Sequence, residues 1–316
     1  MEQGIIPIDS LEIFRTNRYI PTKIGMVSDN AYVSIVATNN CQFNCPYCIN
    51  SSTDRSKNLP IGKAYDNIQS IVDKYGVKEG IILGGEPLLH PDILGLIRRL
   101  RTITGLKMMR LTTNGYYLKQ HPEIIPQLVD KRWGIQGINI SHHGKDSFMN
   151  YSELGYICRL IKEANPEIKI RINSNIWKNN LDTFDSLVSH IRRATEYADE
   201  IRVSNIIPKD DFSVNPINHG EDLILTDNEY IELFESLYQH YLDLGFSIIE
   251  NKETFGFVKY LLIPTRKPII INWNIGSMVS DQVCENDIEH RKINTFKCLV
   301  DGSISLSWNQ NNIIKN

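Results

Sequence analysis

The sequence has 316 residues, of which 41% are hydrophobic and 22% are charged. This length and balance fit one large globular domain or two ordinary ones, and they exclude a mainly disordered chain. With 34 Lys and Arg against 37 Asp and Glu, the net charge is −3. Because such a charge gives no overall attraction for nucleic acid, we expect no nucleic-acid partner.

Features of export or membrane insertion are not evident in the sequence. Residues 1–20 lack an apolar core preceded by basic residues, and no run approaches the ~18 apolar residues of a membrane span. We therefore expect a cytoplasmic protein with reduced thiols and no membrane partner. Its six cysteines are too sparse for a disulfide framework, and three of them are clustered, which favours a metal site.

From residue 31 to residue 207, strand-like apolar runs alternate with segments of helical period. The predicted strands are residues 31–38, 80–85, 107–115, 137–143, 168–175 and 200–207. The predicted helices between them are residues 63–75, 91–104, 122–131, 151–164 and 181–195. Repeated βα units favour parallel strands with right-handed crossovers, so the expected fold class is α/β, a partial (β/α)6 TIM-like barrel.

The alternation ends after Pro208. A helix near residues 227–244 and several short apolar runs predict a smaller β-rich C-terminal region. The expected organisation is an N-terminal extension (1–30), a core (31–207) and a C-terminal region (208–316) that closes the barrel. In such barrels, ligands bind at the C-terminal ends of the strands.

The first chemical motif directly follows the first predicted barrel strand. Cys41, Cys45 and Cys48 have the spacing C-x3-C-x2-C. Thiolates are natural ligands of iron–sulfur clusters, and three cysteines leave one iron of a four-iron cluster open for other chemistry. A zinc knuckle with a fourth ligand elsewhere is the alternative.

The second motif ends the next predicted strand, where Gly84, Gly85, Glu86 and Pro87 read GGEP. Two glycines let the backbone approach a ligand closely, and a carboxylate can accept a hydrogen bond from an amine. Alone, the motif could be an ordinary turn before a helix. Its position at a strand end adjacent to the cysteine loop makes a shared site the better interpretation.

Together, the cysteine triplet, with Tyr47 before its last cysteine, and the downstream GGEP resemble the radical S-adenosylmethionine (radical SAM) superfamily over residues 31–205. The resemblance implies a [4Fe–4S] cluster on the three cysteines, whose fourth iron chelates the amine and carboxylate of SAM. It implies a 5′-deoxyadenosyl radical that abstracts hydrogen from a substrate. It also implies a flavodoxin or ferredoxin as electron donor.

The resemblance further suggests that SAM contacts lie along the strand ends. The expected cofactor-binding residues are Gly84, Gly85, Glu86, Pro87, Thr113, Asn114, Ser141, Asn173 and Ser174, with Ile206 or a neighbour covering adenine. Polar residues at strand ends are also common turn formers, so the side-chain roles stay open.

Four further residues are substrate candidates. His142, His143 and Lys145 form a titratable group at a strand end, which could bind substrate or shuttle a proton, or form a solvated turn. Arg171 could grip a carboxylate or phosphate, or form an ion pair between layers.

The other three cysteines are scattered. Cys158 has helical spacing from apolar neighbours and is expected in the core. Cys284 and Cys298 are either buried inert thiols or, as in radical epimerases, hydrogen-atom donors to a substrate radical. Their region resembles the auxiliary-cluster (SPASM/twitch) extensions, but Ser307 and Trp308 stand where a cysteine is expected, so we expect no auxiliary cluster.

The function expected from this resemblance is radical chemistry on a small polar metabolite such as a nucleotide, sugar or amino-acid derivative. The GTP-cyclising branch of molybdenum-cofactor synthesis is similar over the barrel, but the sequence lacks three further C-terminal cysteines and a terminal Gly-Gly, so we expect a different role. The alternative is a modifier or epimerase of a ribosomal peptide, which would need a partner or leaderless recognition. A hypothesis of another class is a non-catalytic iron–sulfur or zinc sensor or scaffold.

Overall fold

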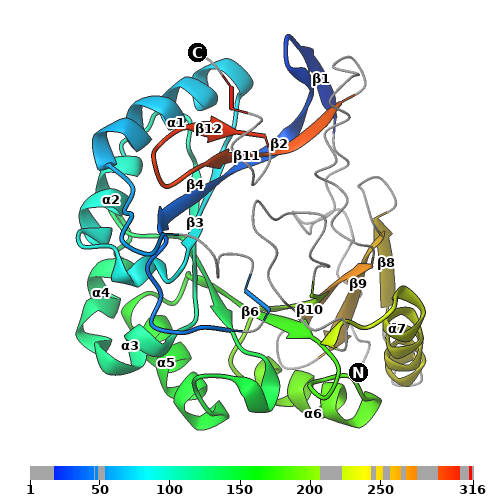
Figure 1. The fold of residues 1–316 in the computed structure, drawn as a ribbon. Helices are drawn as coiled ribbons and strands as arrows, with labels where there is room; N and C mark the ends of the chain where they lie inside the picture. Colours follow the sequence, from blue (N-terminus) through cyan, green and yellow to red (C-terminus); the bar gives the residue numbers. More distant parts are fainter. Residues whose placement is uncertain are drawn as a thin grey trace, which may run out of the picture.

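The computed structural model describes residues 18–45, 47–48, 54–206, 223–242, 247–251, 257–264, 268–275, 291–306 and 313–314. The described strands form one 12-stranded sheet in the order β12-β11-β2-β3-β4-β5-β6-β7-β10-β9-β8, with β1 paired to β2. Figure 1 shows the sheet curving around an interior, with helices α1–α6 on its outer side. The predicted α/β class and partial TIM-like barrel are confirmed.

All six predicted barrel strands are present and run parallel. They are β2 (Gly25–Thr38), β3 (Glu79–Gly84), β4 (Met108–Thr113), β5 (Gly137–Ser141), β6 (Lys169–Ile176) and β7 (Glu200–Asn205). Strand β2 begins earlier than predicted and forms an antiparallel pair with β1 (Tyr19–Thr22). This pairing lies within the segment that was expected to be an N-terminal extension.

Helices lie between these strands, and α7 follows the last of them. They are α1 (Ile61–Tyr75), α2 (Ile93–Leu100), α3 (Tyr116–Gln120), α4 (Ile125–Leu128), α5 (Tyr151–Ala164), α6 (Phe184–Thr195) and α7 (Asp227–Leu242), with short 3-10 helices η3 (Pro87–Leu89), η4 (Pro122–Ile124) and η5 (Gly144–Asp146). Helices α2, α5 and α6 begin at side-chain caps: Asp92 accepts from the Gly95 N–H, and Asn150 and Thr183 form capping boxes with Glu153 and Ser186. These caps fix where the chain turns back toward the next strand.

The prediction of one continuous helix over residues 122–131 is wrong. The segment is divided into η4 and α4, and α4 ends at Leu128. Pro126 has no N–H to donate to the carbonyl of Pro122, so a helix that begins at residue 122 cannot continue through it. Asp130 then accepts from the N–H groups of Arg132 and Trp133, which stabilises a turn in place of a further helical turn.

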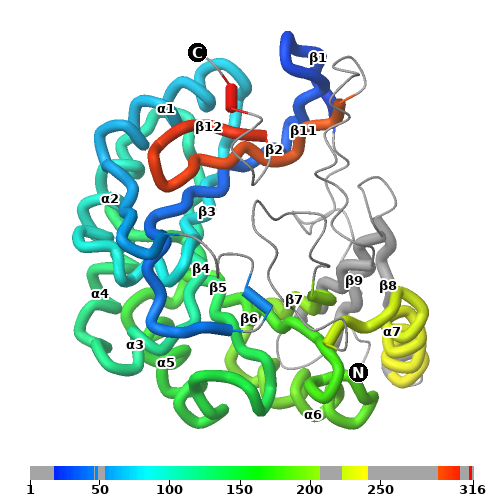
Figure 2. The backbone as a smooth tube through the Cα atoms, in the orientation of Figure 1, coloured from blue at the N-terminus to red at the C-terminus, as the bar shows by residue number. Residues whose placement is uncertain are grey.

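The C-terminal strands extend the barrel sheet at both edges. Strand β10 (Pro268–Ile275) pairs in parallel with β7, and β11 (Lys292–Cys298) pairs in parallel with β2. Strands β9 (Phe257–Pro264) and β8 (Ser247–Asn251) follow β10 in antiparallel order, and β12 (Ile304–Ser305) pairs with β11. Figure 2 shows β11 running beside β2, although more than 250 residues of chain separate their ends.

The barrel strands present two different faces. On the helix side, Ile82, Leu111, Ile140 and Ile172 are completely buried in one apolar core with the helices. Each buried side chain of this size contributes about 1.5–3 kcal/mol of transfer free energy. Because alternate residues of a strand point to opposite faces, the residues between them face the interior, and most of these are polar. Among the described helices, none has both the length and the apolarity to cross a bilayer.

Candidate functional site

The C-terminal ends of the barrel strands surround a cavity of about 340 Å³. Most residues predicted for the site line it. These are Cys41, Cys45, Cys48, Gly84, Gly85, Thr113, Asn114, Ser141, His143, Asn173, Ser174 and Ile206. The two motifs of the sequence therefore meet in one place.

The end of β3 packs directly against the loop that leads to the cysteines. The N–H of Gly85 donates to the Thr38 carbonyl at 2.7 Å, and the N–H of Glu86 donates to the Asn40 carbonyl at 2.7 Å. Gly84 has φ +147°, and a Cβ atom on Gly85 would lie 2.3 Å from the Asn40 oxygen. The glycines are thus required by this main-chain contact, which positions Cys41.

Glu86 is completely buried and does not line the cavity. Its carboxyl group accepts from the Thr113 hydroxyl at 2.7 Å, the Asn114 N–H at 2.8 Å and the Leu88 N–H at 3.2 Å. Burial raises the pKa of Glu86 to about 7, although these hydrogen bonds oppose the shift. In this structure Glu86 joins the ends of β3 and β4. Buried Pro87 is the first residue of η3.

The three cysteines are partly exposed free thiols on one loop. Arg55 fixes this loop by donating to the Cys41 carbonyl at 3.2 Å and to Oδ1 of Asn44 at 3.1 Å. Within the described residues, no three His, Cys, Asp or Glu side chains converge on one metal position. A cubane cluster binds each thiolate to a different iron, so its ligands need not converge on a single point. The all-thiol donor set fits an iron–sulfur cluster.

Aromatic side chains wall the cysteine loop. Phe43 stacks on Phe148, and both line the cavity. Tyr47 packs against His143 and Trp177, with ring centroids 5.2 and 4.6 Å away. Phe43, Tyr47 and Phe148 thus give the cavity an aromatic wall beside the thiols.

His143 faces the cavity from the end of β5. Its Nδ1 accepts from the Asn175 N–H at 2.9 Å, so a neutral ring carries its proton on Nε2. Burial, with a smaller effect of His142, lowers the pKa of His143 to about 3. The ring is therefore neutral near pH 7 and offers a hydrogen-bond donor.

The other members of the predicted titratable group are elsewhere. His142 is buried on the helix side, where its Nε2 lies 3.0 Å from the Met149 carbonyl, and Lys145 is exposed on η5. The hydroxyl of Ser174 bonds to Nε2 of His190 at 2.7 Å, and Nδ1 of His190 bonds to the Tyr151 hydroxyl at 2.8 Å. This buried network joins the end of β6 to α5 and α6 on the helix side of the sheet.

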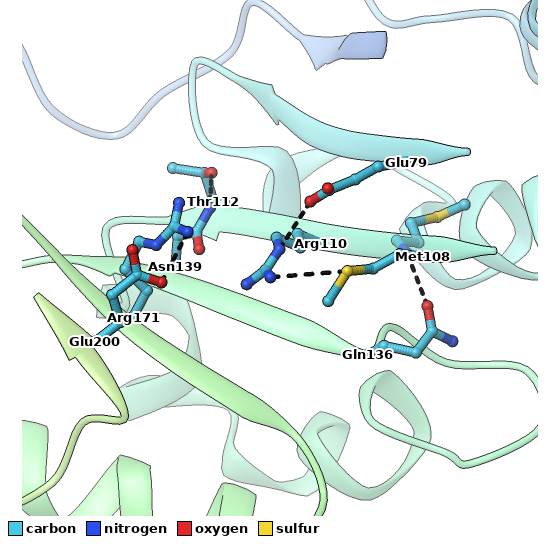
Figure 3. A network of polar contacts seen from close by, with 9 residues as sticks. Glu79, Met108, Arg110, Thr112, Gln136, Asn139, Arg171 and Glu200 are labelled. Carbon is cyan, nitrogen blue, oxygen red and sulfur yellow. Dashed lines mark hydrogen bonds and ion pairs between the residues drawn. The ribbon is translucent and has the colours of Figure 1, made fainter. Parts of the chain in front are cut away.

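Ion pairs join side chains of neighbouring barrel strands, as Figure 3 shows. Arg171 pairs with Glu200 at 2.8 Å, and Arg110 pairs with Glu79 at 2.8 Å. None of these four residues lines the cavity. Of the two roles considered for Arg171, the structure shows the ion pair between strands.

Sequence reasoning missed several cavity residues, of which Arg202 is the most distinctive. The others are Leu83, Thr112, Asn175, Ser204 and Asn205, together with Phe43 and Phe148 described above. A signal was present, because Arg202 alternates with Glu200 and Ser204 on a predicted strand and so shares their inward face.

The remaining cysteines lie away from the cavity where they are described. Cys158 is buried in α5, as predicted. Cys298 is buried at the end of β11, with its Sγ 3.9 Å from the Gly302 carbonyl. It shares a strand face with Phe296, which stacks on Tyr75 of α1, so it faces the helix layer. Cys284, Ser307 and Trp308 lie outside the described residues.

The barrel, the three-cysteine loop and the glycine-rich strand end together resemble SAM-dependent radical proteins. Residues 35–147 match the family model described as "Radical SAM superfamily". Over these residues the chain is similar to the radical SAM superfamily, whose cofactors are a [4Fe–4S] cluster and SAM.

Similar proteins include the "GTP 3',8-cyclase" of Mannheimia succiniciproducens, which is 29% identical over 192 residues, covering 56% of this chain and 53% of the relative. The chain thus spans about half the length of that relative. Among solved structures, Streptococcus suis SuiB bound to S-adenosylmethionine has a TM-score of 0.61 at 15% identity, covering 92% of this chain and 64% of that one. SuiB bound to precursor peptide SuiA has a TM-score of 0.53 at 18% identity, covering 68% and 47%. Both show a similar fold.

Proposed function

We propose that this chain is a radical SAM enzyme that abstracts hydrogen from a small polar metabolite. Cys41, Cys45 and Cys48 would hold a [4Fe–4S] cluster, and the ends of β3 to β7 would hold SAM. When bound, the cluster and SAM supply the one-electron chemistry that cleaves SAM reductively and activates a substrate C–H bond.

One observation carries this proposal: the cysteine loop and the two glycines of GGEP line the same cavity, and the two segments are joined by main-chain hydrogen bonds. A structural zinc knuckle would not need a cavity beside its thiols, and a scaffold would not need polar strand ends that face it. Zinc bound in a closed site has all its positions filled by protein.

The chain's own residues bind and shield in this proposal. The glycine-rich end of β3 presents main chain to the amine of SAM, and Asn114 and Thr113 continue that edge from β4. His143 donates from Nε2 and, with a pKa of about 3, is suited to hydrogen bonding and unsuited to delivering a proton near pH 7. Phe43 and Tyr47 exclude water from the reacting atoms.

The polar interior supports a polar substrate. Asn173, Asn175, Arg202 and Ser204 line the cavity below its rim. A nucleotide is one of the substrates to test, because the relative from Mannheimia succiniciproducens is named a GTP 3',8-cyclase. A peptide, as in the SuiB–SuiA structure, is the competing substrate class, although a likeness of fold does not favour it.

The partial exposure of the cysteines supports access by an electron donor. We propose a flavodoxin or ferredoxin as that partner, because the cluster must receive one electron in each cycle. The donor would approach the loop from the outside, since the aromatic wall and the strand ends occupy its other side.

Metal content and SAM binding test the proposed site. Anaerobic reconstitution should give about four irons per chain, and calorimetry should then show SAM binding. The full chain with Cys45→Ala should lose the iron, whereas Cys158→Ala, which removes a buried thiol in α5, should retain it. Stoichiometric zinc without iron uptake would reject the proposal.

Isotope transfer tests the substrate class. A perdeuterated candidate nucleotide, sugar or amino acid that is a substrate should transfer deuterium to the 5′-deoxyadenosine formed from SAM. Transfer from a peptide, and from none of the metabolites, would favour the competing class.

A further inference from the structure

Arg55 is an exposed cation that lies against the cysteine loop. One guanidinium nitrogen donates to the Cys41 carbonyl at 3.2 Å, and a second donates to Oδ1 of Asn44 at 3.1 Å. The two acceptors are therefore a cysteine of the triplet and the residue that precedes Cys45. Because the guanidinium is planar and rigid, these two bonds hold its charge beside two of the three thiols.

The same loop is also held by the end of β3. The N–H groups of Gly85 and Glu86 donate to the Thr38 and Asn40 carbonyls, both at 2.7 Å. These two main-chain bonds do not involve Arg55, so they remain when its side chain is replaced. The charge of Arg55 can thus be removed while the main-chain support of the loop is kept.

The charge of Arg55 acts on both neighbouring thiols. Burial raises the pKa of Cys41 and the pKa of Cys45, and the positive charge of Arg55 opposes this shift at each. At Cys41, the charge of Glu86 acts in the opposite direction to that of Arg55. Among the residues that the structure describes, no carboxylate forms an ion pair with Arg55.

We propose that Arg55 raises the reduction potential of the cluster that Cys41, Cys45 and Cys48 would hold. This inference rests on the proposed function of the same site. A four-iron cluster with three thiolate ligands is anionic, and reduction adds one electron, which the donor loses, while no bond or proton changes. A fixed cation beside two of the ligands stabilises the added negative charge. Arg55 is therefore a positioning residue for electron uptake that acts through its charge.

A potentiometric titration of the anaerobically reconstituted full chain measures this effect without SAM or substrate, with paramagnetic resonance reporting the reduced cluster. Arg55→Gln removes the charge and should lower the equilibrium constant for reduction by about threefold, as expected for an exposed ionic interaction. At 59 mV per tenfold, this change lowers the potential by about 28 mV. Arg55→Lys keeps the charge and should stay within about 1.5-fold of the wild type.

Lys57→Gln is the matched control. It removes another exposed cation of the same segment, one whose charge acts on Asp54. Its equilibrium constant for reduction should also stay within about 1.5-fold of the wild type, because solvent and salt screen a charge that is not held against the loop.

Equal potentials of the wild type and Arg55→Gln, or equal shifts for Arg55→Gln and Lys57→Gln, would overturn the proposal. A purely structural role of Arg55 predicts less bound iron with an unchanged potential in the iron-loaded fraction, which would overturn it as well. If Arg55→Gln does not retain iron, Arg55→Lys decides, since a fall of about threefold in a variant that keeps the charge would contradict the proposal. Iron uptake and SAM binding are measured separately, so they can succeed while this proposal fails.

Discussion

Replacing Gly85 by alanine should separate the two motifs of the site. The new Cβ would lie 2.3 Å from the Asn40 carbonyl oxygen and 2.7 Å from that of Asn39. Ordinary contact begins at 3.4 Å, so the closer pair must move apart by about 1.1 Å, the difference between 3.4 and 2.3 Å. Both obstructing atoms are main chain, so no side-chain rotation relieves the contact.

The energetic cost follows from the contacts that this movement disturbs. Two hydrogen bonds of 2.7 Å, from Gly85 to Thr38 and from Glu86 to Asn40, would stretch or break. Each contributes about 0.5–1.5 kcal/mol, and overpacking adds about 1–3 kcal/mol. The free energy of unfolding should fall by roughly 2–6 kcal/mol, and the cysteine loop should retain iron poorly.

Urea unfolding of the cluster-free chain and iron analysis after reconstitution measure the two effects. Gly62→Ala in α1 is the matched control, because a Cβ there meets nothing within 4 Å. It should stabilise the chain by about 0.5–1 kcal/mol through helix propensity. A Gly85→Ala protein with wild-type stability and iron content would refute the reasoning.

Three further predictions concern buried polar groups and a helix cap. Glu86→Ala leaves three hydrogen-bond donors without an acceptor, so it should lower the free energy of unfolding in urea by about 3 kcal/mol or more. Glu123→Ala, which removes an exposed carboxylate, should change it by less than ~0.5 kcal/mol. Equal effects of the two substitutions would contradict this prediction. Burial lowers the pKa of His190 to about 3 in the folded chain, compared with an ordinary pKa of 6.5. Below pH 6.5 the unfolded chain therefore binds a proton at this histidine that the folded chain does not bind. The free energy of unfolding should fall as the pH drops below 6.5. His190→Gln should make that dependence shallower by about 1.4 kcal/mol per pH unit between pH 6 and 4, and an unchanged slope would exclude a neutral buried ring. Asp92→Ala removes the acceptor for the Gly95 N–H and should lower the stability by about 1 kcal/mol, with no loss of iron.

Local pattern was enough to predict much of the fold. Alternation of apolar residues located all six barrel strands, and helical periodicity located α1 and α5. The break at Pro126 was also local but was overlooked, because apolar periodicity does not register a missing N–H. The edge positions of β10 and β11 were not predictable in this way, since strand pairing between distant segments leaves no periodic signal.

In the candidate site, too, local sequence pattern predicted some features and missed others. Spacing identified Cys41, Cys45 and Cys48, and position at strand ends identified most of the cavity. Strand ends alone did not separate inward from outward side chains, which is why His142 was grouped with His143. Arg202 was missed because it lies one layer below the strand end.

Formation of 5′-deoxyadenosine is the most direct test of the central claim that the cysteine loop and the strand ends form one SAM-cleaving site. The anaerobically reconstituted full chain should release 5′-deoxyadenosine from SAM when supplied with a low-potential reductant. Cys45→Ala should abolish the product, and Cys158→Ala should preserve it. No product from the iron-loaded wild-type chain, or equal product from Cys45→Ala, would contradict the account.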